Sequence, residues 1–168
     1  CDLLISYDAE TLFRHIHRVN ADGLVIVDPA LESASLEKQA FLDAPLLKQL
    51  EQEHKDEQAT GTQIADFLAS AQERGINLLA LPCSDLLQQL AKTSEYSRSD
   101  VKRVTALCAM AAAMAHIGLP VEVLYATVDH VFAKHQRLLP LNHRAIDMAY
   151  QQVTALGMAN DWPFPARD

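Results

Sequence analysis

The side chains of this chain that are best placed to do chemistry stand directly after short apolar runs. Asp8 and Asp28 end two such runs, and Cys83 and Ser84 come directly after a third. If the runs are strands of an open α/β sheet, these side chains lie at its carboxyl edge, where such sheets place their ligand sites. The N–H groups of a helix that begins near Ser84 would attract an anion, and Arg103 would supply positive charge to a phosphate or a carboxylate. These residues are therefore the candidates for an anion site, should this domain contact an anionic ligand or substrate.

A purely structural interpretation of the same residues stays open. Aspartates at strand ends, such as Asp8 and Asp28, commonly cap helices, and their own charge repels an anion. Ser84 or Asp85 can cap the next helix, and Cys83 can be reactive or inert. The positive charge expected near the site comes from basic residues of one segment, namely Arg98, Lys102 and Arg103.

No stand-alone catalytic signature occurs in the chain. With only 5 glycines there is little material for a glycine-rich phosphate loop. The cysteines lack the C-x-x-C spacing of zinc or iron–sulfur sites, and Cys108 is predicted to be a small core residue. His15 and His17 are two apart and diverge on a helix, whereas Met110 and Met114 are one turn apart and are predicted to pack in the core. We therefore predict neither a catalytic residue nor a metal site.

Composition limits the class of protein. The chain has 168 residues, is 49% hydrophobic and carries a net charge of −8, which argues against nucleic acid as a partner. No apolar run reaches the roughly 18 residues that a membrane span needs. The chain has three cysteines, which is a small and odd number, whereas a secreted disulfide framework needs several pairs. We therefore expect a reduced, cytoplasmic setting.

The elements that would position these residues form a βαβ pattern. Apolar runs at 3–7, 24–27 and 76–81 are predicted strands, and a helix over 9–19, capped by Asp8, joins the first two. Strands this uniformly apolar are typical of a parallel sheet covered on both faces. We therefore predict an α/β fold with a mainly parallel sheet flanked by helices in three layers (α/β/α).

Residues 31–75 interrupt this pattern as a charged helical insertion. A helix is expected over 35–57, broken near Pro45, and a second one after a cap at Thr60 or Thr62. The second helix would turn apolar residues inward and end at Gly75; these are Ile64, Phe67, Leu68 and Ala71. The insertion can be a solvated excursion from the sheet or an arm that binds a partner protein.

The C-terminal half is predicted to be helical. After a short helix that begins at Ser84 or Asp85, longer helices are expected over 100–118, 121–134 and 141–156, the last one ended by Gly157. The prolines within 158–168 exclude regular structure there, so this segment is a linker or a docking tail. We take 1–157 as one domain.

Several segments occur in the order known from one family. The stretches 1–10 and 22–28 fit its "aDvLia.d.ea … GG.li.D" core, and 81–86 fits its proline-centred entry to a short helix. A helix over 101–119 and the pattern through 132–150 come next, in the same order. Together they resemble the gamma domain of 2-oxoacid:ferredoxin (acceptor) oxidoreductases, the family of pyruvate and 2-oxoglutarate ferredoxin oxidoreductases.

Two departures from that pattern stand out. The family's opening G-x-G-G-Q-G segment is not found, and the chain has no initiator Met, so we expect the N-terminal part of the domain to be missing. Arg103 and Cys108 stand where the family usually has asparagine and glycine.

The resemblance implies an accessory role in an enzyme complex. Such enzymes decarboxylate a 2-oxoacid oxidatively with thiamine diphosphate, pass electrons through iron–sulfur clusters to ferredoxin, and form acyl-coenzyme A. The thiamine diphosphate and the clusters belong to partner domains, and coenzyme A is the cosubstrate near this domain. Partners would be the other subunits and, through them, ferredoxin. The alternative is a non-catalytic helical adaptor that binds a partner protein through the 31–75 insertion.

Overall fold

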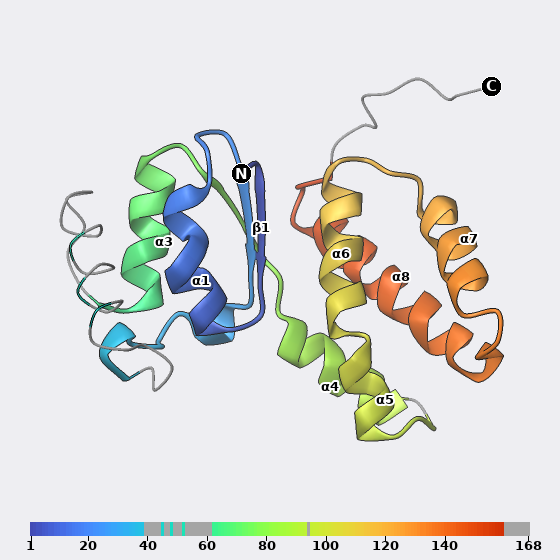
Figure 1. The fold of residues 1–168 in the computed structure, drawn as a ribbon. Helices are drawn as coiled ribbons and strands as arrows, with labels where there is room; N and C mark the ends of the chain where they lie inside the picture. Colours follow the sequence, from blue (N-terminus) through green and yellow to red (C-terminus); the bar gives the residue numbers. More distant parts are fainter. Residues whose placement is uncertain (39–44, 46–47, 49–51, 53–61, 94, 160–168) are drawn as a thin grey trace. The chain divides into compact units, whose positions relative to one another are not determined.

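The computed structural model describes residues 1–38, 45, 48, 52, 62–93 and 95–159 (Figure 1). Contacts within the chain divide it into two compact units, Cys1–Ala80 and Leu81–Asp168. Each unit has a hydrophobic core of its own.

The first unit is built on a sheet of three parallel strands in the order β1-β2-β3. These are β1 (Leu3–Ser6), β2 (Leu24–Val27) and β3 (Asn77–Ala80), with Leu3 opposite Leu24 and Leu24 opposite Asn77. All residues of the central strand β2 are buried, in keeping with its uniformly apolar sequence. The predicted α/β fold with a mainly parallel sheet is confirmed.

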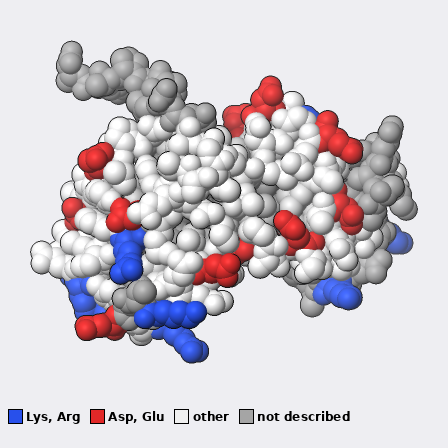
Figure 2. All heavy atoms as spheres, turned by 180° about the vertical axis from the view of Figure 1, so that it is seen from behind, with Lys and Arg blue, Asp and Glu red and all other residues white. Residues whose placement is uncertain are grey.

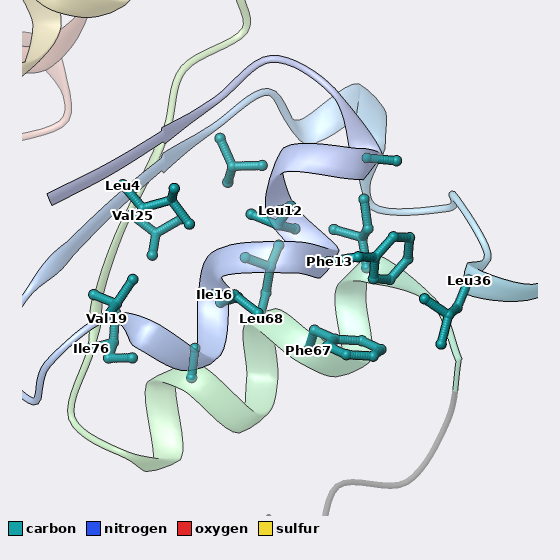
Figure 3. Close-up of a cluster of buried hydrophobic side chains, with 14 residues drawn as sticks. Leu4, Leu12, Phe13, Ile16, Val19, Val25, Leu36, Phe67, Leu68 and Ile76 are labelled. Atoms are coloured by element: carbon teal, nitrogen blue, oxygen red, sulfur yellow. The ribbon is translucent and has the colours of Figure 1, made fainter. Parts of the chain in front are cut away.

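Two helices, α1 (Ala9–His15) and α3 (Ile64–Glu73), pack against one face of this sheet (Figures 1 and 3). The Phe13 and Phe67 rings meet edge to face, with their centroids 5.0 Å apart. Val25 and Val27 point toward these helices because alternate residues of a strand share a face. The arrangement of helices in three layers stays a prediction, since among the described residues of the unit that holds the sheet the helices α1 and α3 form a single layer.

Local details of the first unit differ from the predicted elements. Helix α1 is shorter than the predicted 9–19, because the chain tightens into a 3-10 turn at Ile16–Arg18. The N-cap of α3 is Gln63, whose backbone N–H donates to Asp66 at 2.8 Å, so the cap predicted at Thr60 or Thr62 is wrong. The inward residues of α3 and its end at Gly75, where φ is +86°, are as predicted.

The 31–75 insertion is described only in part. Leu36–Lys38 form a 3-10 turn, and Ser35 pairs with Gln63 in an isolated antiparallel bridge. Most of the helix predicted over 35–57 lies outside the described residues, so the adaptor alternative, which depends on the whole insertion, stays a prediction.

The second unit consists of helices, which confirms the predicted helical C-terminal half. They are α4 (Cys83–Thr93), α5 (Arg98–Arg103), α6 (Thr105–His116), α7 (Val121–Val131) and α8 (Leu139–Ala155). Gly157 comes after α8 with φ +67°, as expected for a glycine at a helix end. None of the helices in the described part of the chain is both long and apolar enough to cross a membrane.

The helix predicted over 100–118 is in fact two helices, α5 and α6, which break at Val104. The Val104 N–H donates to the Val101 carbonyl, three residues back, and the Thr105 hydroxyl donates to the Lys102 carbonyl at 2.8 Å. A hydroxyl that bonds to a nearby carbonyl competes with the helical ladder, which accounts for the break.

Burial and helix ends in the second unit correct further predictions. Met110 was expected in the core but is 38% exposed, because the stripe of α6 that packs inward is made of Cys108 and alanines. Helix α7 ends at Val131, three residues earlier than the predicted 134.

Candidate functional site

Asp8 and Asp28 lie at the carboxyl ends of the neighbouring strands β1 and β2, as predicted. Both carboxylates cap the helical turns that begin directly after them. The Asp8 carboxylate accepts hydrogen bonds from the Thr11 backbone N–H at 2.7 Å and from the Thr11 hydroxyl at 3.0 Å. The Asp28 carboxylate accepts from the Ala30 N–H at 3.0 Å, and Asp28 is buried. The structure therefore supports the capping interpretation directly.

Cys83 and Ser84 open helix α4 in the second unit. Because α4 begins at Cys83, Ser84 and Asp85 lie within its first turn, so the prediction that one of them caps the helix is wrong. The backbone N–H groups of Asp85 and Leu86 both donate to the Pro82 carbonyl, at 3.1 and 3.0 Å. The donors expected to hold an anion after Ser84 are thus already in hydrogen bonds. Cys83 is buried, and Ser84 is exposed.

A groove of about 440 Å³ lies between α4 and α5. Basic side chains gather around this end of the second unit (Figure 2). Arg98 and Lys102, which the sequence singled out for their charge, line the groove; Lys92, which it did not, lines it as well. Its lining is completed by Leu87, Gln88, Ala91 and Val101.

Arg103 lines a different cavity, of about 260 Å³, on the side of α5 that faces α8. Its neighbour there, Asp100, accepts a hydrogen bond from the Ser97 hydroxyl at 2.8 Å and pairs with Arg137 at 3.2 Å. The hydrogen bonds from Ser97 and Arg137 lower the pKa of Asp100. The negative charge of this carboxylate is therefore paired with Arg137. Arg103 has no ion-pair partner among the described residues and is the free positive charge at this cavity.

The remaining lining of the Arg103 cavity is mixed in polarity. His135 and the buried Asn142 are its other polar residues, and the Asn142 amide donates to the Leu138 carbonyl at 2.8 Å. A small anionic group is what this combination of a guanidinium, an imidazole and an amide suits chemically.

A polar cluster between α7 and α8 was not predicted from the sequence. The Tyr125 hydroxyl donates to Asp147, and this hydrogen bond, together with burial, raises the pKa of Tyr125 to about 12. His143 lies 2.8 Å from Asp129 through Nε2, and its ring lies 4.6 Å from that of Tyr125. These are contacts between neighbouring helices, and no pattern of spacing within either helix would have paired them.

The cysteines and metal-binding residue types form no metal site in the described residues: no group of three or more His, Cys, Asp or Glu is suitably placed. Cys108 is fully buried, and burial raises its pKa to about 11, so its predicted role as a core residue is confirmed.

The comparison with known families decides the relationship. Residues 1–152 match the family described as pyruvate ferredoxin/flavodoxin oxidoreductase. The chain belongs to this family. The match to the pyruvate ferredoxin/flavodoxin oxidoreductase family runs through both compact units and confirms, at the level of the family, the resemblance seen in the sequence.

Curated relatives of this family member include subunits of archaeal 2-oxoacid:ferredoxin oxidoreductases. It is 24% identical over 152 residues to 2-oxoacid:ferredoxin oxidoreductase 2, subunit alpha, of Aeropyrum pernix, covering 90% of this chain and 24% of that protein. It is 23% identical over 153 residues to the alpha subunit of the Saccharolobus solfataricus 2-oxoacid:ferredoxin oxidoreductase, with the same coverage. The chain thus spans about a quarter of the length of the curated relatives it matches. Both relatives are named alpha subunits, and the term gamma does not occur in their names.

Proposed function

We propose that this chain is the gamma-type domain of a 2-oxoacid:ferredoxin oxidoreductase, carried within a longer polypeptide of the alpha type. The observation that carries the proposal is the family match over residues 1–152. The names and the greater length of the archaeal relatives support the view that such a domain forms one part of an alpha subunit. The complete enzyme would convert a 2-oxoacid to its acyl-coenzyme A and pass the electrons to ferredoxin.

We assign the domain an accessory role, without a catalytic residue of its own. Two of the carboxylates singled out in the sequence have structural tasks, since Asp8 and Asp28 cap the turns after their strands. Thiamine diphosphate and the iron–sulfur clusters are assigned to partner domains, in line with the family resemblance. The free state of the three cysteines agrees with a cytoplasmic enzyme.

Contacts to an anionic substrate are proposed at the start of α4 and at the end of α5. Arg103 supports this role best, because its guanidinium lines a cavity and has no ion-pair partner among the described residues. Ser84 is exposed and would add a hydroxyl. The other candidate contacts are Asp8, Asp28 and Cys83. The ligand would be coenzyme A or the 2-oxoacid.

The test uses the complete enzyme, purified with its partner subunits. We expect ferredoxin to be reduced when a 2-oxoacid and coenzyme A are supplied, and acyl-coenzyme A to form in step. If the purified enzyme fails to reduce ferredoxin with pyruvate, with 2-oxoglutarate and with 2-oxobutyrate, the proposed function is wrong.

The ligand contacts are tested by Ser84→Ala and Arg103→Ala in the same enzyme. Loss of the Arg103 charge is expected to raise KM for coenzyme A or for the 2-oxoacid several-fold. Lys134→Ala, which removes an exposed basic residue after α7, is the matched control. If both Michaelis constants stay unchanged in both variants, Ser84 and Arg103 are structural residues.

A further inference from the structure

The groove between α4 and α5 combines an apolar floor with a basic rim. Leu87 and Ala91 lie one helical turn apart on α4, and Val101 of α5 faces them across the groove. Lys92, Arg98 and Lys102 surround this strip, and all three side chains are exposed. Such a surface is amphipathic, with a place for aliphatic side chains and charges around it.

The charge of the rim is not balanced within the described chain. Lys92, Arg98 and Lys102 form no ion pair with any described residue, in contrast to Arg14 with Glu10 and Arg137 with Asp100. The chain as a whole carries a net charge of −8, so this groove is a local exception to an acidic protein. A positive surface of this kind favours a negatively charged partner and speeds its association.

Free backbone donors for a small phosphate are few at this groove. The first-turn N–H of Asp100 in α5 donates to the Ser97 hydroxyl at 3.2 Å, and the N–H groups of Asp85 and Leu86 in α4 donate to Pro82. Small anions are typically held by such N–H groups together with converging charged side chains. Flexible lysines around an apolar strip better fit an amphipathic partner whose apolar face covers the strip and whose acidic residues flank it.

We propose that the α4–α5 groove is the docking site for an acidic amphipathic helix of another polypeptide in the same enzyme. Leucine-like side chains of that helix would cover Leu87, Ala91 and Val101, while its Asp and Glu residues would pair with Lys92, Arg98 and Lys102. Binding of an amphipathic helix in an apolar groove is a common mode of recognition between proteins. This inference rests on the proposed function in one respect, namely that the partner polypeptide belongs to a 2-oxoacid:ferredoxin oxidoreductase.

Zero-length cross-linking of the assembled enzyme tests the contact directly. A carbodiimide joins a lysine amine to a carboxylate only where the two already touch. We expect peptide mapping to show Lys92 and Lys102 joined to Asp or Glu residues of one helical segment in a partner polypeptide. Cross-links from Lys134 to a partner without any from Lys92 or Lys102 would overturn the proposal.

Charge reversal supplies the second test. Lys92→Glu combined with Lys102→Glu is expected to weaken binding of the partner subunit at least tenfold at low salt, with the difference from the wild type shrinking as salt is added. Lys134→Glu is the matched control and should bind the partner as the wild type does. Equal affinity of the double variant and the wild type would overturn the proposal.

A third measurement separates a protein partner from a small anion. Acylation of Lys92 and Lys102 by an amine-reactive reagent is monitored with inorganic phosphate, with coenzyme A or with the partner subunit present. Protection by the partner subunit alone supports the docking site, and protection by phosphate or coenzyme A in its place overturns it. The activity assay with 2-oxoacid and ferredoxin is read separately, so failure of the proposed function is told apart from failure of this contact.

Discussion

The Sγ of Cys108 lies 3.7 Å from the carbonyl oxygen of Ala145, where α6 packs against α8. Both side chains are fully buried. A thiol and a methyl group are small enough for the two helix backbones to approach closely, and they join the core formed with Leu90, Val101, Val104 and Leu141. This contact explains why the stripe of small residues on α6 forms the inner face of the helix, and two predictions rest on it.

Cys108 is predicted to be chemically inert in the folded protein. Its pKa of about 11 leaves almost no thiolate at pH 8, and its side chain is inaccessible. Iodoacetamide treatment and peptide mapping are expected to show Cys108 labelled at least a hundredfold more slowly in buffer than in concentrated urea. Equal rates of labelling in the two conditions would show that α6 and α8 do not pack as described.

Ala145→Leu is predicted to destabilise the second unit by about 1–3 kcal/mol, because three extra carbon atoms do not fit beside Cys108 without displacing a helix. Urea unfolding of the purified polypeptide provides the measurement. Ala126→Leu, on an exposed position of α7, makes the same change without the packing conflict and is expected to be nearly neutral. Similar losses in the two variants would count against the α6–α8 contact.

The Asp100 carboxylate is predicted to make stability depend on pH at the acid end. Its pKa is lowered in the folded state by the hydrogen bonds from Ser97 and Arg137. A lowered folded pKa means that the stabilisation is present above the unfolded value of about 4 and is lost as pH falls through the folded value. Unfolding measured from pH 7 to pH 3 should therefore show a smaller acid loss in Asp100→Asn. Arg137→Met should raise the folded pKa of Asp100 toward the unfolded value, so that the acid loss is smaller and is complete at a higher pH. Arg144→Met should leave the acid loss unchanged.

Asp8→Ala is predicted to reduce stability by about 1 kcal/mol, because the first turn of α1 loses the acceptor for the Thr11 N–H. Asp8→Asn keeps a capping oxygen and should retain most of that stability. If Asp8 also contacts substrate, Asp8→Asn will change KM of the assembled enzyme while the unfolding midpoint barely moves. Loss of stability without any change in KM assigns Asp8 to capping alone.

Gly23 is predicted to tolerate no side chain. A Cβ at this position would lie 2.7 Å from Val19 Cγ1 and 2.8 Å from the Asn20 carbonyl oxygen, so Gly23→Ala should cost roughly 1–3 kcal/mol in unfolding free energy. Gly75→Ala is the informative comparison. A Cβ there meets nothing within 4 Å, and the expected cost of about 1–2 kcal/mol comes only from its φ of +86°. A Gly23→Ala protein as stable as the wild type would contradict the close approach of this turn.

Local features of the chain were predictable where the interactions that decide them are local. The apolar run of β2 predicts a buried parallel strand, because a strand with no polar residues must be covered on both faces. Asp8 caps α1 through contacts only three residues away, and the inward residues of α3 are given by helical periodicity alone. The family resemblance could also be recognised from the sequence, because it depends on the order of segments along the chain.

Other features were decided only by contacts between distant segments. The exposure of Met110 depends on how α6 packs against α8, and the periodicity of residues 100–118 does not predict it. Lys102 and Arg103 are neighbours in sequence, but Lys102 lines the groove between α4 and α5 and Arg103 lines the other cavity. Only the packing of the helices separates them in this way. Tyr125 and Asp147, 22 residues apart, meet because α7 and α8 are neighbours. Periodicity tells which side of a helix is apolar, but the tertiary structure alone determines which partner covers it and which charges remain unpaired.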